Sequence, residues 1–337
     1  MTRFRVLSDR PRRWRLAIVG FGHVGRAFAR LLLDRGPRLS ERYGMEALVT
    51  SILTQHHGWV ADETGLDLAG FLAGEMLPER GPRPAIRSLP ADVLVEVSTL
   101  DALTGRPALD HLREAIESGM HVITANKGPI AHGYAELQAL ADRHGVKLRF
   151  ESAVGDNLPV FNLVRETQPT AQILGLRGIL NSTTNYLLSQ VARGSTAEAA
   201  LAEAQRVGVA ERDATADLEG FDAAVKAVIL GNVLLGLPLR VTDVVRRPVG
   251  EGVIAVARSV AQEGKRLRMM AGFEGGGARW EPVTLAPDDP FYAVDGFSLA
   301  VELSTDVAGK LFVALLQPGV EQTAFGLLSD LVSLARR

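Results

Sequence analysis

An acid and an amine stand four residues apart in the apolar run FDAAVKAVIL, as Asp222 and Lys226, with Asp217 just upstream. Residues four apart on a helix share a face. On a solvated surface such a pair contributes only about 0.3–0.5 kcal/mol. From Phe221 to Leu235, however, the only polar residue besides the pair is Asn232, which predicts a buried helix. Buried charges are costly unless they are paired, so this pair needs a reason to persist.

The chemistry that such a pair could do is proton transfer. Desolvation lowers the pKa of a lysine amine, and a neighbouring carboxylate aims it. Lys226 is therefore a candidate proton donor. The upstream acids Glu211 and Asp217 lie in a loop-like stretch. They could bind the ammonium group of an amino-acid substrate, or they could be an ordinary solvated turn. A purely structural ion pair stays open for Asp222 and Lys226.

A second candidate site is the pattern GFGHVG, from Gly20 to Gly25, between a strand-like run and a helical pattern. In a dinucleotide site the first glycine permits a tight turn and the second lets the backbone approach the pyrophosphate. The third allows the helix to pack closely on the strand, and the phosphates lie at the helix N-terminus. Strand, turn and helix occur here in the order that the motif requires. We predict a dinucleotide site rather than a turn needed only for packing.

The choice of dinucleotide depends on the end of the second strand, where an acid would bind the adenine ribose of NAD. That end reads Thr54, Gln55, His56, His57 and contains no acid. An acid would repel a 2′-phosphate, whereas hydroxyl, amide and imidazole groups tolerate one. We predict NADP as the preferred cofactor and NAD as the alternative, and the histidines could simply be surface loop residues.

The elements of the first half must position these residues. Short β-branched runs alternate with longer helical patterns, which predicts βαβ units and a parallel sheet. Glycines end the helical patterns, and the first is expected to stop at Gly36 and Pro37. The expected strands are 15–19, 47–53, 93–97, 121–124 and 147–150.

The second half indicates an α+β domain built around a sheet. We expect a strand over 173–180, helices over 184–192 and 196–207, and the apolar helix that carries Lys226. Strand-like runs follow at 253–261, 297–305 and 309–317. The fold class predicted is thus α/β, a Rossmann-type doubly wound parallel sheet with a second α+β substrate and dimerisation domain.

Composition excludes several classes of protein. The 337 residues include no cysteine, which rules out thiolate metal sites, disulfides and a cysteine nucleophile. The formal net charge of −2 gives no broad field for nucleic acid or an anionic membrane. The longest uncharged apolar run, from Ala227, is shorter than the ~18 residues of a membrane span. We expect a cytoplasmic protein with a small-molecule substrate.

Five motifs, in this order, resemble the homoserine dehydrogenase family. They are GFGHVG, GMHVITANKGPIA, FESAVG, GILNSTTNYLL and DLEGFDAAVKAVIL. The resemblance implies reduction of aspartate 4-semialdehyde to homoserine with NADPH or NADH, in threonine, methionine and isoleucine biosynthesis. It implies a homodimer, a dinucleotide-binding domain over 1–150 to which 310–337 returns, and a substrate-binding and dimerisation domain over 151–309. The chain is too short for the regulatory domain of longer members, so control by threonine through such a domain is not expected.

Site residues carried over from the family are predicted residue by residue. The catalytic residues are Lys226, Lys127 and Asp222. The substrate-binding residues are Glu211, Asp217, Asp222 and Thr183. The cofactor-binding residues are Gly20, Gly22, His23, Val24, Gly25, Thr99, Lys127, Gly208 and Gly319. Glu151 and Val154 match a monovalent-cation site.

The sequence departs from the family after FESAVG, where Asp156 and Asn157 replace a glycine-rich run. This departure leaves open a changed substrate pocket and the loss of the cation site. Two rival functions remain: another NAD(P)-dependent dehydrogenase of a related amino-acid aldehyde, and a non-catalytic NAD(P)-binding sensor. The retained lysines and acids argue against the sensor, because a sensor needs no proton donor.

Overall fold

The computed structural model describes residues 11–74 and 82–335 and divides into two compact units. The first unit contains the chain up to Asn157 together with the segment from Val320 onward, and the second runs from Leu158 to Gly319. The domain limits at residues 150 and 310 stay a prediction. In the described part of the chain, no helix combines the length and the apolar character that a bilayer crossing requires.

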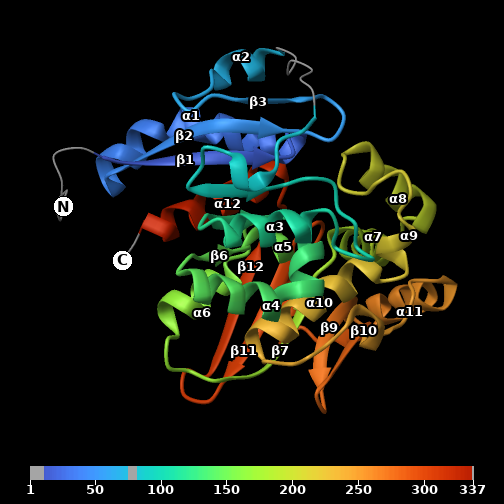
Figure 1. Cartoon of the computed structure of the whole chain (residues 1–337). Helices are drawn as coiled ribbons and strands as arrows, with labels where there is room; N and C mark the ends of the chain where they lie inside the picture. The colour runs from blue at the N-terminus through green and yellow to red at the C-terminus, as the bar shows by residue number, and fades with distance from the viewer. Residues whose placement is uncertain (1–10, 75–81, 336–337) are drawn as a thin grey trace. The chain divides into compact units, whose positions relative to one another are not determined.

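The first unit is built on a six-stranded sheet in the order β3-β2-β1-β4-β5-β6. Strands β3, β2 and β1 lie side by side in Figure 1. All neighbours pair in parallel except β3, which is antiparallel to β2. Side chains alternate between the two faces of each strand, so helices are needed on both sides. The strands are β1 (Arg12–Val19), β2 (Met45–Leu53), β3 (Trp59–Ala61), β4 (Val93–Glu96), β5 (His121–Thr124) and β6 (Leu148–Arg149). The predicted doubly wound parallel sheet is confirmed.

Two pairs of helices cover this sheet. On one face α1 (His23–Tyr43) packs beside α12 (Val320–Ala335), in a core that includes Phe28, Ile18 and Leu327. In Figure 1 the red helix α12 lies among the blue and green elements of this unit. The pair α3 (Ala108–Glu117) and α4 (Lys127–His144) packs together, and α3 contacts β4 and β5. The short elements are α2 (Leu68–Ala73), the 3₁₀ turn η1 (Ile86–Ser88) and α5 (Ser152–Gly155).

The prediction that the first helix stops at Gly36 and Pro37 is wrong, since α1 runs through Pro37 to Tyr43. Proline removes one helical hydrogen bond, but Pro37 is exposed and Leu33, whose carbonyl loses that bond, is 46% exposed. Water can therefore take the place of the missing donor. Buried Leu39 anchors the extra turns, and Gly44 ends the helix with a φ of 61°.

The second unit contains another six-stranded sheet, in the order β12-β11-β7-β9-β10-β8. Its pairs are antiparallel except for the short pair of β8 with β10. The strands are β7 (Ile173–Ile179), β8 (Val245–Arg246), β9 (Arg266–Glu274), β10 (Gly277–Leu285), β11 (Leu299–Thr305) and β12 (Lys310–Leu315). The predicted second α+β half is therefore confirmed, although the sequence did not indicate β9 and β10 as strands.

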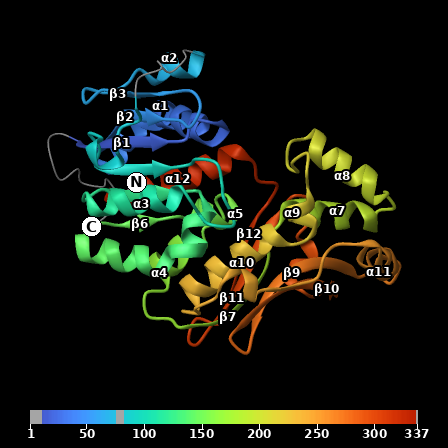
Figure 2. The ribbon, with the colours of Figure 1, turned by 45° about the vertical axis from the view of Figure 1, so that its right-hand side comes forward.

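Helices of the second unit pack on this sheet (Figure 2), where α7, α10 and α11 each contact β9. Residues 253–261, predicted as a strand, belong to helix α11, so that prediction is wrong. Buried Ala257 lies four residues after half-buried Val253, a helical spacing that the β-branched residues obscured. The helices are α6 (Val160–Thr167), α7 (Ser182–Ala192), α8 (Ala197–Arg206), α9 (Thr215–Leu218), α10 (Phe221–Leu234) and α11 (Glu251–Gln262), with 3₁₀ turns η2 (Val241–Asp243) and η3 (Pro290–Ala293).

Candidate active site

The glycine turn after β1 has the geometry that its sequence predicts. Gly20 has a φ of 100°, and a β-carbon there would lie 2.4 Å from the carbonyl oxygen of Val97. A β-carbon on Gly25 would lie 2.5 Å from the carbonyl oxygen of Gly20. At Gly22, in contrast, no atom lies within 4 Å of the β-carbon position. Gly20 and Gly25 are thus needed for packing, while Gly22 leaves the backbone open to a close ligand.

The N-terminus of α1 is available to an anion. Gly22 is the N-cap and provides no side-chain hydrogen bond to the first turn, which contains no acid. His23 is exposed and Val24 is half-buried in that turn. Backbone N–H groups and the helix dipole at such an end favour a phosphate group. The arrangement fits the pyrophosphate of a dinucleotide.

The turn after β2 contains no acid. The Thr54 hydroxyl donates to the carbonyl of Gly58 at 2.9 Å and accepts from the backbone N–H of His57 at 2.9 Å, which closes the turn into β3. Gln55, His56 and His57 are exposed. Three exposed neutral or weakly basic side chains therefore stand where an NAD site would place its acid.

A buried acid organises the ends of β4 and β5. Glu96 is fully buried, and its carboxylate accepts hydrogen bonds from the backbone N–H and the hydroxyl of Ser98. The side-chain amide of Asn126 donates to the Ser98 carbonyl at 3.3 Å and caps α4 by accepting from Gly128. This network fixes the loop that bears exposed Thr99 and the helix start that bears half-buried Lys127. Glu96 was not among the site residues predicted from the sequence, although an acid at the end of an apolar strand could have indicated it.

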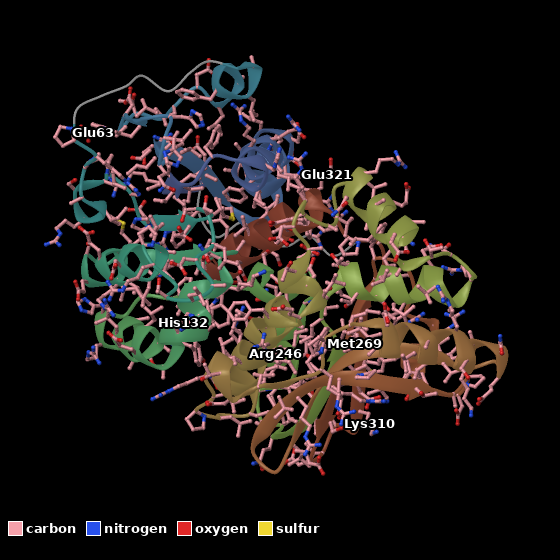
Figure 3. All side chains as sticks on the ribbon, turned by 90° about the vertical axis from the view of Figure 1, so that its right-hand side faces the viewer. Glu63, His132, Arg246, Met269, Lys310 and Glu321 are labelled. Carbon is pink, nitrogen blue, oxygen red and sulfur yellow. The ribbon has the colours of Figure 1, made fainter. Side chains whose placement is uncertain are left out.

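In the second unit the predicted ion pair exists on α10. Nζ of Lys226 lies 2.8 Å from Oδ2 of Asp222, and it donates to the backbone carbonyl of Leu180 at 2.8 Å. The two side chains are 14% and 15% exposed, and α10 is buried from Ala223 to Val225 and from Ala227 to Gly231. The prediction of a buried helix is confirmed. The start of α10 is held by Phe221, whose ring centroid lies 5.5 Å from the guanidinium carbon of Arg246, labelled in Figure 3.

Asp217 joins this pair through a residue that sequence reasoning missed. The side-chain amide nitrogen of Asn181 donates to Oδ1 of Asp217 at 2.7 Å and to Oδ2 of Asp222 at 3.0 Å. Asn181 is the N-cap of α7, where its side-chain oxygen accepts from the backbone N–H of Thr184. An asparagine before a helical run signals a cap, but nothing in the sequence signals its contacts with two distant acids.

This polar cluster can do specific chemistry. Lys226 presents an ammonium group in a mostly buried setting, where it can stabilise a developing oxyanion and donate a proton. Two carboxylates held beside it supply negative charge for a cationic substrate group. The cluster consists of Asn181, Asp217, Asp222 and Lys226 and is called the acid–amine cluster below.

Family models match both units. The model for the NAD-binding domain of homoserine dehydrogenase matches residues 20–151, and the homoserine dehydrogenase model matches residues 159–332. The chain belongs to the homoserine dehydrogenase family.

Several homoserine dehydrogenases are similar to this chain over nearly their whole length. The enzyme of Methanocaldococcus jannaschii is 35% identical, covering 95% of this chain and 98% of the relative. The NAD(+)-dependent homoserine dehydrogenase of Pseudomonas canavaninivorans is 32% identical, covering 95% and 96%. A hyperthermophilic archaeal homoserine dehydrogenase solved in complex with NADPH superposes with a TM-score of 0.79 at 27% identity, covering 96% and 98%. The family is one of NAD(P)-dependent oxidoreductases.

Other residues predicted from homoserine dehydrogenases lie on the second unit's surface and helix ends. Thr183 is buried in the first turn of α7. Glu211 is exposed, and its backbone carbonyl accepts from the side chain of Gln205. Gly208, with a φ of 77°, follows α8, and Gly319 lies two residues after Gln317, whose φ is 52°. The described contacts bring Asp217, Asp222 and Lys226 together, but they do not tie Glu211 to this group.

The position that departs from the homoserine dehydrogenase pattern keeps a glycine-like backbone. Asp156 has a φ of 55° and a ψ of −100°, a backbone conformation that glycine adopts more readily than residues with a side chain. Its Oδ1 accepts a hydrogen bond from the Thr323 hydroxyl of α12 at 2.7 Å. The aspartate thus retains the turn and ties it to α12 within the first unit.

The two predicted cation ligands lie just before this turn. Glu151 is 1% exposed and Val154 is buried in α5. Among residues 11–74 and 82–335, no three His, Asp or Glu side chains gather into a metal-binding group. A monovalent cation stays a prediction for Glu151 and Val154.

Proposed function

We propose that this chain reduces aspartate 4-semialdehyde to homoserine, with NADPH or NADH as the reductant. The observation that carries the proposal is the acid–amine cluster, in which Lys226 lies 2.8 Å from Asp222 on a buried helix. The reaction is a step toward threonine, methionine and isoleucine. It needs a proton donor for an oxygen atom and a binding group for an ammonium, and the cluster contains both.

The roles of the cluster residues follow from their charges. When bound, the reduced nicotinamide supplies a hydride to the aldehyde carbon. Lys226 holds a proton at Nζ, stabilises the negative charge that grows on the aldehyde oxygen, and passes the proton to it. Asp222 orients that amine. Asp217 binds the substrate ammonium, and Glu211 and Thr183 are proposed as further substrate-binding residues.

The cofactor-binding residues are proposed on the first unit and two glycines of the second. The open backbone at Gly22 and the uncapped start of α1 suit a pyrophosphate. Lys127 is proposed as the second lysine of the site, at the N-terminus of α4. The full proposed set is Gly20, Gly22, His23, Val24, Gly25, Thr99, Lys127, Gly208 and Gly319.

We propose NADP as the preferred cofactor. The exposed residues after β2 include Gln55, His56 and His57 and no acid, so nothing there would repel a 2′-phosphate. The similar enzyme that is named NAD(+)-dependent and the similar structure that contains NADPH show that the family includes both uses. The chain's own residues therefore have to decide the preference.

The experiment is an assay of the purified protein that follows nicotinamide absorbance with aspartate semialdehyde, once with NADPH and once with NADH. We expect turnover with both cofactors, and at low cofactor concentration we expect it to be faster with NADPH than with NADH. Turnover only on another amino-acid aldehyde would replace the substrate and keep the enzyme class. Cofactor binding without turnover of any aldehyde would favour the sensor.

Three further features are proposed from the resemblance. One is a homodimer, which light scattering of the purified protein tests. Another is a monovalent cation at Glu151 and Val154, for which a change of activity between sodium, potassium and bulky organic cations is the test. The third is a cytoplasmic location, which fractionation of the source cells would check.

A further inference from the structure

Asn181 occupies an unusual position in the acid–amine cluster. It is 4% exposed, and its one amide nitrogen donates to carboxylates from two different helices, α9 and α10. The two acceptor oxygens, on Asp217 and Asp222, can therefore be no more than about 5.7 Å apart. Two carboxylates that close repel each other unless a donor lies between them.

The orientation of this amide is set by its other end. The side-chain oxygen of Asn181 accepts from both the backbone N–H and the hydroxyl of Thr184, at 2.9 and 3.0 Å. Because these two groups need an acceptor, the NH₂ group must face the acids. The helix cap of α7 therefore fixes which way the amide points.

The residue before Asn181 completes the arrangement. The backbone carbonyl of Leu180 accepts from Nζ of Lys226 at 2.8 Å. Two consecutive residues after β7 thus hold the cluster: Leu180 binds the amine of Lys226 through its carbonyl, and Asn181 binds both acids through its side chain. These contacts span 36, 41 and 46 residues of sequence.

We propose that Asn181 is a positioning residue for the reaction, which holds Asp217 and Asp222 aimed beside Lys226. The inference rests on the proposed function for the roles of those three residues. Its physical basis is that an amide can donate to two carboxylates at once without adding charge. A small polar residue could cap the helix equally well, but it would leave the two acids unbridged.

The first test is Asn181→Ser, because serine is an N-cap as good as asparagine and lacks the amide donors. Asn185→Ser is the matched control. It lies one turn later in α7, is also buried, and donates to the carbonyls of Gly296 and Ser298 instead of to the acids. We expect kcat/KM for the aldehyde to fall at least about tenfold in Asn181→Ser, with KM raised and kcat lowered. NADPH affinity should change less than about twofold in both variants.

The second test is the isosteric variant Asn181→Asp, which keeps the acceptor for Thr184 and places a third carboxylate against two others. The titratable groups that its side chain contacts are Asp217 and Asp222, and Asp222 is in turn paired with Lys226. Once protonated, the introduced carboxyl group could donate as the amide did. The ratio of variant to wild-type activity should therefore rise several-fold as the pH falls from 8 to 6, whereas a purely structural role predicts a constant ratio.

A swap separates this inference from the substrate assignment. In the double variant Asn181→Asp with Asp217→Asn, an amide again faces a carboxylate. The second substitution should therefore recover more than half of the decrease in denaturant midpoint that Asn181→Asp causes. This readout needs no activity and holds if the substrate is another aldehyde. Additive losses in the swap, or an Asn181→Ser enzyme as active as Asn185→Ser, would overturn the proposal.

Discussion

The indole ring of Trp280 lies directly against the α-carbon of Gly220. A β-carbon at Gly220 would stand 2.1 Å from Cε3 of that ring. Trp280 is fully buried on β10, and Gly220 is the N-cap of α10 with a φ of 75°. The sheet of the second unit thus sets the point at which α10 begins. Since Asp222 and Lys226 follow two and six residues later, this contact fixes the positions of their side chains relative to the sheet.

Gly220→Ala should be strongly destabilising. A left-handed backbone costs alanine about 1–2 kcal/mol, and the clash with a buried ring adds about 1–3 kcal/mol. Gly236→Ala is the matched control, with a φ of 65° but no atom within 4 Å of the β-carbon position. In denaturant unfolding, the free energy of unfolding of the control should fall only by the cost of the left-handed backbone. Equal losses of stability in the two variants would show that the Trp280 ring moves aside at little cost.

Lys226→Ala should abolish turnover and leave the cofactor site intact. Removal of a general acid costs about 10²–10⁴-fold in rate, and Lys226 is the only amine in the acid–amine cluster. Aldehyde reduction is measured by nicotinamide absorbance, and NADPH binding by fluorescence titration. Lys265→Ala, which removes an exposed lysine of the same unit paired with Glu263, is expected to behave as wild type. Full activity in Lys226→Ala would make the ion pair structural.

Gln55→Asp should shift the cofactor preference toward NADH. The residue is exposed immediately after β2, where an acid repels a 2′-phosphate and accepts from ribose hydroxyls. We expect the ratio of kcat/KM for NADPH over NADH to fall roughly tenfold, which corresponds to about 1.4 kcal/mol. Gln55→Asn tests for a change of shape without charge. An unchanged ratio in Gln55→Asp would place the adenine ribose away from this turn.

Glu302 should make stability depend on pH. The bidentate hydrogen bond from Arg177 lowers the pKa of Glu302, burial opposes this, and Lys310 (labelled in Figure 3) lowers it further. A pKa that is lower in the folded state gives stability that is present above the unfolded value near 4.5 and lost as the pH falls through the folded value. The free energy of unfolding of Glu302→Gln should therefore be about 1 kcal/mol below that of wild type at pH 7, and the difference should be smaller at pH 3.5.

The comparison for Glu302 is Glu41→Gln, which neutralises an exposed carboxylate on α1. Both variants are unfolded with denaturant at the two pH values, beside wild type. The control should show little difference from wild type at either pH. If the deficit of Glu302→Gln were as large at pH 3.5 as at pH 7, the loss would come from packing rather than from the ionised carboxylate.

Local patterns predicted the first unit well because its signals are local. The glycine turn, the apolar strands and the glycine-ended helices each depend on neighbours in sequence. Helix α1 continued past Pro37 only because that proline is exposed while Leu39 is buried, and burial is not visible in sequence. Helix α11 was predicted as a strand since its Val and Ile residues favour strands, and one buried alanine gave too little helical signal.

The acid–amine cluster was predictable in part for the same reason. Asp222 and Lys226 share a helix, so their spacing of four reveals the pair. The bridge from Asn181 connects three separate elements and depends on how β7 ends beside α9 and α10. Only the folded chain brings such distant positions together.

Helix α12 has a consequence for the order in which the protein can be built. Leu327, Leu328 and Leu331 of this helix belong to the same apolar core as Ile18 and Phe28. A ribosome makes α12 only after the whole of the second unit has been synthesised. The first unit therefore cannot complete its apolar core until about half the chain has been synthesised after it, and until then the part of the sheet face beside α1 that α12 covers stays exposed to water.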